Sequence, residues 1–183
     1  MKKIILAFLL ILFSVFSFQK SFAQDIVLSP TPTPAIVNIQ YDLPYPGLSP
    51  DNPLYFLKAI RDNLLGLFIS DPVKKADYDL LMADKRLVSS QTLINENKDD
   101  LAITTLSKSG NYFYQAIQSA QSAKKQGENA DPTIDRLLIA SEKHQQVILE
   151  MEQKTSGETK ENLDLLLGRV KGFEQSVQDL KSN

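Results

Sequence analysis

The sequence predicts an all-α protein: an antiparallel bundle of about four long helices, preceded by a shorter amphipathic helix and a Pro-rich extended segment. Apolar side chains recur every three to four residues in four successive stretches after residue 71, as they do on one face of a helix. The loops between these stretches are only a few residues long, which makes successive helices antiparallel neighbours. No apolar–polar alternation of the kind typical of strands competes with this prediction.

The first 23 residues have the layout of a secretory signal peptide. Two lysines follow Met1, residues 4–18 are apolar and uncharged, and residues 21–23 (Ser-Phe-Ala) suit cleavage. The fifteen residues of the apolar run would span ~23 Å as a helix, short of the ~30 Å hydrocarbon core of a bilayer. We therefore expect export and cleavage after Ala23; the alternative is an uncleaved N-terminal anchor that tethers the protein to a membrane.

Residues 24–50 form a Pro-rich linker or strap. Seven of the nine prolines lie between Pro30 and Pro53. Alternation of Pro with Ser and Thr over residues 29–34 favours polyproline II, which is typical of a semi-rigid spacer; a ligand for a proline-binding groove is the alternative. Tyr and Leu side chains at residues 41–48 predict that this later part docks on the helices.

The helical bundle domain is assigned to residues 51–183, and its first helix is predicted from Pro53 to about Ile69. Its apolar residues follow helical spacing, so we expect them to cover the bundle. The alternative is an interfacial membrane helix or a face that docks a partner. The candidate residues of such a partner or membrane face are Leu54, Leu57, Leu64 and Phe68.

Four long helices are predicted over residues 72–96, 99–125, 132–154 and 158–180. Each has an apolar seam of coiled-coil type, in which small residues let a partner helix approach closely. Asp71 and Asp131 each precede a proline and are expected to be N-caps. Further end signals are Asp99 or Asp100 as a cap, a capping box from Thr155 to Glu158, and Gly127 after a helix end. Inside the helix predicted at 99–125, residues 107–111 are weak helix formers, which admits a break there.

Composition excludes most familiar enzyme classes. The 183 residues include 20 Lys and Arg, 22 Asp and Glu, one His and no Cys, with a net charge of −2. The absence of Cys excludes thiolate chemistry and Cys-based zinc sites, and the charge excludes a basic nucleic-acid surface. Phosphate-binding Gly-rich motifs and a GxSxG nucleophile motif are also missing.

The remaining candidates for chemistry have structural explanations. His144 lies in a predicted seam without the carboxylates of a Glu-x-x-His metal motif, so we expect a hydrogen-bonded core histidine. Five carboxylates are expected at helix surfaces or ends: Asp77, Asp79, Asp84, Asp99 and Asp100. We predict no catalytic, cofactor-binding or metal-binding residues, and hence a protein that is not an enzyme.

Three segments carry a resemblance to a known family. They are residues 48–58 (LSPDNPLYFLK), residues 71–76 (DPVKKA) and residues 80–87, which end in ADKRL. Together they resemble the bacterial family of exported helical proteins known as domain of unknown function 5667. The sequence departs from it at Phe56, where many members have proline. The resemblance implies an exported or membrane-associated all-helical protein without assigned catalytic residues; we also expect Arg86 to pair with Asp51 or another acid near the strap.

The sequence thus favours an exported, non-catalytic helical bundle that binds or scaffolds something at the cell envelope. Its expected partner is an unidentified envelope protein, with membrane contact through residues 4–18 or the first helix, and without nucleic acid. One alternative is a periplasmic-type stress chaperone or sensor, and another is a membrane-tethered protein. The oligomeric state is left open.

Overall fold

The computed structural model describes residues 38–182 of the chain, which form helices and their connecting segments. The helices are α2 (Tyr55–Leu67), α3 (Pro72–Asn95), α4 (Asp99–Lys125), α5 (Asp131–Glu152) and α6 (Gly157–Ser182). The predicted all-α bundle is confirmed. The predicted signal peptide and the Ser/Thr-Pro spacer lie outside the described residues.

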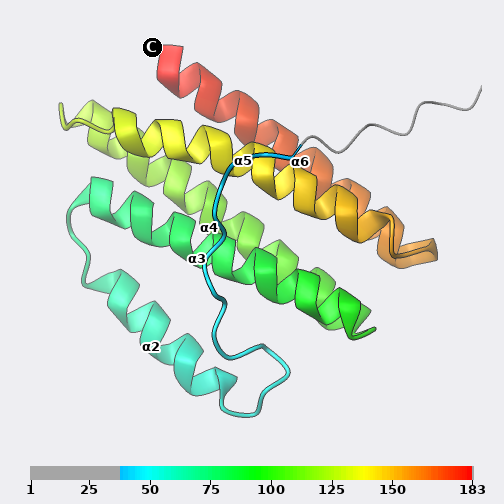
Figure 1. Cartoon of the computed structure of the whole chain (residues 1–183). Helices are drawn as coiled ribbons and strands as arrows, with labels where there is room; N and C mark the ends of the chain where they lie inside the picture. Colours follow the sequence, from blue (N-terminus) through cyan, green and yellow to red (C-terminus); the bar gives the residue numbers. More distant parts are fainter. Residues whose placement is uncertain (1–37, 183) are drawn as a thin grey trace, which may run out of the picture. The chain divides into compact units, whose positions relative to one another are not determined.

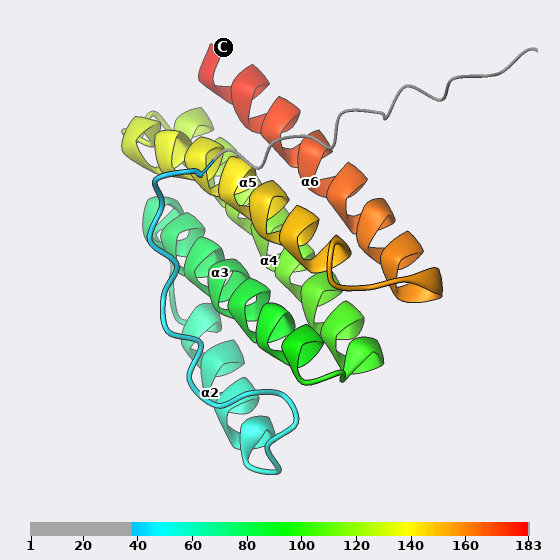
Figure 2. The same cartoon turned by 45° about the vertical axis from the view of Figure 1, so that its right-hand side comes forward.

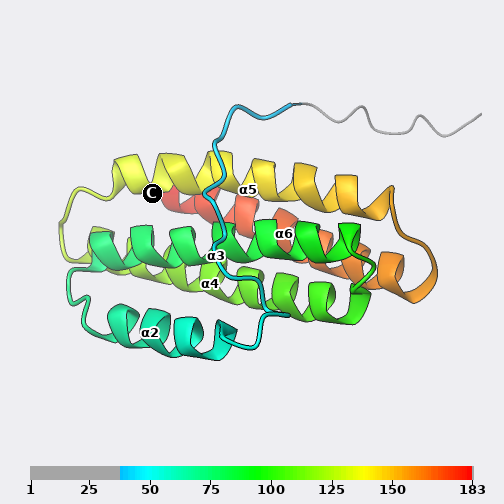
Figure 3. The ribbon, with the colours of Figure 1, turned by 60° about the horizontal axis from the view of Figure 1, so that its bottom comes forward.

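The four long helices run antiparallel in sequence order, and α3 lies beside α4 while α5 lies beside α6 (Figures 1 and 2). Connections of three to five residues make this arrangement the simplest one. Helix α2 lies against the α3–α4 pair, on the side away from α5 and α6 (Figure 3). The bundle core therefore belongs to α3–α6, and α2 is an addition to one of its sides.

The predicted seams form the core. Leu87, Phe113, Leu137 and Val177, one from each long helix, have no exposed surface. The rings of Phe113 and Phe173 stack with 5.4 Å between their centroids, which joins α4 to α6. Several core residues of α3 and α4 are small and wholly buried, which lets these two helices approach closely: Ala76, Ala83, Ala102, Ala116, Ala120 and Ala123.

Serines in the seams add hydrogen bonds between α3 and α4. Ser90 Oγ donates to the Ala102 carbonyl at 2.9 Å, and Ser109 Oγ donates to the Ala83 carbonyl at 2.8 Å. Both hydroxyls are buried, so these bonds satisfy groups that would otherwise be costly to enclose. Ser109 lies in the predicted weak stretch at 107–111, where α4 is continuous and Ser109 is bonded to α3.

Some helix ends follow the predicted signals. Asp71 caps α3 by accepting a hydrogen bond from the Lys74 amide at 3.0 Å. Gly127 has a φ of +77°, and the Glu128 amide donates to the Ala123 carbonyl, which completes a Schellman end on α4. Asn97 closes α3 in the same way, with a φ of +58° and a bond from the Lys98 amide to the Leu93 carbonyl.

Other predicted caps are wrong. Asp131 is the first residue of α5, and the N-cap position before it is Ala130. The N-cap position of α4 is Lys98, and Asp99 instead accepts a hydrogen bond from Thr159 of α6 at 3.0 Å. Thr155 donates backwards to carbonyls of α5, so it does not form the expected box with Glu158. A tertiary contact occupies the Asp99 side chain, and the end of α5 occupies the Thr155 hydroxyl.

The strap over residues 38–54 crosses α5 and α3 before it reaches α2 (Figures 1 and 2). The Ile39 amide donates to Gln146 Oε1 of α5 at 2.9 Å, and Lys143 Nζ donates to the Ile39 carbonyl. Tyr41 and Leu43 pack against the core, as predicted. Tyr45 and Leu48 do not: they are 84% and 42% exposed.

Candidate docking surface

Helix α2 is held to the bundle mainly by polar and small residues. Gly66 is buried under Tyr78 of α3, whose ring would lie 3.1 Å from a Cβ atom at that position. The Tyr78 hydroxyl donates to the Asp62 carbonyl at 2.6 Å, and the Tyr112 hydroxyl of α4 donates to Asn63 Oδ1 at 2.9 Å. These contacts fix which side of α2 turns inward.

The first turns of α2 are attached to the strap in the same manner. Lys58 Nζ donates to the Pro46 carbonyl at 2.6 Å and to the Leu48 carbonyl at 3.2 Å. Partial burial of this ammonium lowers the pKa of Lys58. Arg61 makes a salt bridge of 2.6 Å to Asp62, whose side chain is buried. The rotation of α2 about its axis is therefore set by contacts along its length.

The apolar side of α2 faces outward as a result. Eight large apolar side chains in and beside α2 are each between 50% and 81% exposed. We call them the α2 outer face: Leu54, Phe56, Leu57, Ile60, Leu64, Leu65, Leu67 and Phe68. The expectation that this face covers the bundle is wrong, because the small and polar side of the helix packs inward instead. All four candidate contact residues, Leu54, Leu57, Leu64 and Phe68, belong to the outer face.

A second feature is a buried polar cluster that ties the strap to the bundle. Tyr41 Oη donates to Asp84 Oδ2 at 2.6 Å, and His144 Nε2 lies 2.8 Å from Asp84 Oδ1. The ring of Phe113 meets the His144 ring edge-on, with 5.0 Å between centroids. His144 is therefore the hydrogen-bonded core histidine that was predicted.

Asp84 and Asp79 contradict the expectation that these carboxylates lie at the surface, because both are buried. Asp84 is enclosed by the strap, which supplies its phenol partner from 43 residues away. Asp79 lies 2.5 Å from Lys75 Nζ. Burial raises the pKa of Asp79, and the bond to Lys75 opposes that shift. Both carboxylates are held by structural partners.

Arg86 does not pair with Asp51. Its guanidinium lies over the Tyr112 ring, 4.1 Å from the centroid, and its Nη1 donates to the Met82 carbonyl. Asp51 instead makes a 2.5 Å salt bridge to Lys98, at the start of α4. Arg86 therefore supports the tyrosine that holds α2, through a cation–π contact.

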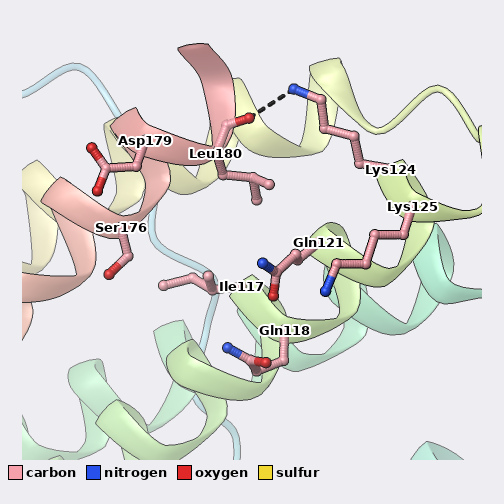
Figure 4. Close-up of a pocket in the computed structure, with 8 residues that line it drawn as sticks. All are labelled: Ile117, Gln118, Gln121, Lys124, Lys125, Ser176, Asp179 and Leu180. Atoms are coloured by element: carbon pink, nitrogen blue, oxygen red, sulfur yellow. Dashed lines mark hydrogen bonds between the residues drawn. The ribbon is translucent and has the colours of Figure 1, made fainter. Parts of the chain in front are cut away.

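An open groove of about 490 Å³ lies between the C-terminal ends of α4 and α6 (Figure 4). Lys124 joins the two helices: its Nζ donates to the Leu180 carbonyl at 2.7 Å, which satisfies an end carbonyl of α6. The lining side chains are Ile117, Gln118, Gln121, Lys124, Lys125, Ser176, Asp179 and Leu180.

Residues 38–182 lack two features that would point to a particular function. Within this range, no three or more His, Asp or Glu side chains are grouped so that they could hold a metal ion. The helices of the same range lack an apolar stretch long enough to cross a bilayer.

Comparison with known proteins places the chain in a family. Residues 47–159, from the strap through α5 to the start of α6, match the family described as Domain of unknown function (DUF5667). The matched part is more than half of the chain and contains α2 with most of its contacts to α3 and α4. Neither a curated protein nor a solved structure matches the chain. On the family match, this chain belongs to the DUF5667 family.

Proposed function

We propose that this protein is an exported, non-catalytic binding or scaffolding module of the cell envelope, and that it docks through the α2 outer face. The observation that carries the proposal is the exposure of eight large apolar side chains in and directly beside one short helix. Contiguous apolar patches on a folded domain are typical of interaction sites.

The rest of the structure supports a docking role for α2. The core of α3–α6 is closed by its own seams, so the bundle does not use the outer face for folding. The inward contacts of Asp62, Asn63 and Gly66 hold the helix in place before any partner arrives. A surface that is fixed in advance loses less conformational freedom on binding.

The export part of the proposal is supported by the signal-peptide layout of residues 1–23. N-terminal sequencing of the protein recovered from producing cells tests it. We expect a mature chain that begins at Gln24. A chain that retains Met1 and stays with the membrane fraction would refute cleavage and support the tethered alternative.

Site-specific photo-crosslinking tests the docking part. A photoreactive residue replaces Leu64 of the outer face, and the matched control carries it at Leu165, which is 73% exposed on α6. We expect crosslinks to an envelope component, protein or lipid, from position 64 and far fewer from position 165. Equal yields from both positions, or no product from position 64, would overturn the proposal.

A further inference from the structure

We propose that the occupant of the α2 outer face is the surface of a phospholipid bilayer, with α2 lying in the boundary between headgroups and acyl chains. This inference rests on the proposed docking function and names its partner. Three observations favour a lipid surface over a protein groove: the breadth of the face, its convexity and the placement of its charges.

The face is too broad for a single helix-binding groove. Phe56 and Leu65 are nine residues apart, which places them about 180° apart around the axis at ~3.6 residues per turn. The intervening directions are filled by other apolar residues of the face, among them Ile60, Leu64 and Leu57. A groove on a partner protein binds a narrow stripe of side chains along a helix, whereas a bilayer contacts about half of the helix circumference at once.

The face is also convex. Helix α2 is the outermost element on its side of the bundle, beyond α3 and α4 (Figure 3). Its apolar side chains point away from the helices to which its inner side is hydrogen-bonded. A projecting helix of this kind can enter a soft surface to the depth of its side chains while the bundle stays in water.

The charges suit a phosphate-bearing surface. Between residues 54 and 68 the charged side chains are Lys58, Arg61 and Asp62. Arg61 lies within the apolar arc, ~40° around the helix from Leu65 at ~3.6 residues per turn, and 64% of its side chain is exposed. Its Nε and Nη2 donate to Oδ1 of Asp62, whose side chain is buried. An arginine at the level of the lipid headgroups can reach lipid phosphates while the aliphatic part of its side chain lies on apolar surface. The α2 outer face therefore carries one exposed arginine, and the carboxylate that pairs with this arginine is buried beneath it.

The sequence carries a second apolar segment ahead of the described domain. This apolar run ends at Phe18, and residues 19–37 separate it from the described domain. In the uncleaved form, two weak membrane signals would act together, as stable anchoring requires. In the cleaved form, α2 alone gives reversible attachment.

A tryptophan reporter tests the proposal, because the chain has no Trp of its own. The full chain carries Phe68→Trp on the outer face or, as the control, Leu165→Trp on exposed α6. Each is mixed with vesicles of phosphatidylcholine and phosphatidylglycerol. We expect a blue shift of the Phe68→Trp emission and quenching by lipids brominated near the headgroup, and neither effect for Leu165→Trp. If only residues 4–18 bind the vesicles, both tryptophans stay in water and neither emission shifts.

Further variants in the Phe68→Trp background separate the contributions. Leu64→Gln is expected to weaken vesicle binding about tenfold, because one large apolar contact is lost. Arg61→Gln is expected to reduce the preference for phosphatidylglycerol by about fivefold. Far-ultraviolet circular dichroism checks that each variant is folded. If Phe68→Trp does not fold, Leu64→Trp serves as the reporter on the outer face.

Three results would overturn the lipid proposal. The first is unchanged Phe68→Trp emission with vesicles, and the second is an equal shift in the emission of Leu165→Trp. The third is a blue shift of Phe68→Trp that follows protein concentration without vesicles. That result would identify a second copy of the chain as the occupant. If the vesicles have no effect but position 64 crosslinks to an envelope protein, only the lipid proposal fails. If both experiments are negative, the docking function fails as well.

Discussion

Replacing both Leu67 and Phe68 with Gln tests whether the α2 outer face is dispensable for folding. The two side chains are 79% and 81% exposed, so each has only about a fifth of its surface buried. Full burial of a large apolar side chain contributes about 1.5–3 kcal/mol. We therefore expect the double variant to lose about 1 kcal/mol or less of the free energy of unfolding.

The matched control is Leu137→Ala in α5, at a position with no exposed surface. Truncation of a buried leucine costs about 2–5 kcal/mol, since contacts are lost and a cavity remains. Urea denaturation followed by circular dichroism measures both variants, and equal m-values show that they unfold in the same way. If the Leu67→Gln/Phe68→Gln variant loses as much stability as Leu137→Ala, then the outer face packs on the bundle and the account is refuted.

Other predictions concern the buried cluster and the inner side of α2. Asp84→Ala removes the partner of Tyr41 and His144, so it should lower the free energy of unfolding by about 2–5 kcal/mol in urea denaturation. It should also speed hydrogen exchange at the Ile39 amide. A smaller loss of stability than in the Leu67→Gln/Phe68→Gln variant would contradict this. Burial, followed by the charge of Asp84, raises the pKa of Tyr41 above its usual 10.0, so its contribution to stability is full below pH 10 and falls at higher pH. Tyr41→Phe should therefore lose less stability than the wild type when the pH rises above 10, and equal losses would count against the cluster. Gly66→Val places methyl groups against the Tyr78 ring, so limited proteolysis should cut α2 sooner while the α3–α6 core resists; unchanged cleavage would show that Gly66 is not packed there.

Regular periodicity made the bundle predictable. The bounds of α4 agree with the prediction at both ends, because a charged first turn and Gly127 mark them locally. The seam residues of α5, including His144, are buried because heptad spacing places them on one side of a long helix. Features of this kind depend on neighbours in the sequence, so spacing is enough to find them.

The orientation of α2 was not predictable in this way. Periodicity shows that a helix has an apolar side, but it does not show which side meets the bundle. The inward side is set by Gly66 fitting against Tyr78 and by hydroxyls that reach Asp62 and Asn63 from other helices. One signal was present in the sequence: small and polar residues recur at Ala59, Asp62 and Gly66 with helical spacing, which permits close packing without large side chains.

The burial of Asp84 was hidden for a similar reason. Its neighbours in sequence, Ala83 and Lys85, show a seam edge followed by a charge, which is typical of a helix surface. The carboxylate is enclosed because the strap brings Tyr41 over it and α5 brings His144 beside it. Pairs separated by 43 and 60 residues leave no trace in local spacing.

Cysteine accessibility tests the outward orientation of α2 most directly, because the chain has no Cys of its own. Single variants Leu64→Cys and Phe68→Cys are compared with Leu87→Cys in the core of α3, each treated with a water-soluble thiol reagent in the native state. We predict rapid labelling at positions 64 and 68, and labelling at position 87 only after unfolding. Protection of positions 64 and 68 to the degree seen at position 87, in dilute protein without lipid, would contradict the account.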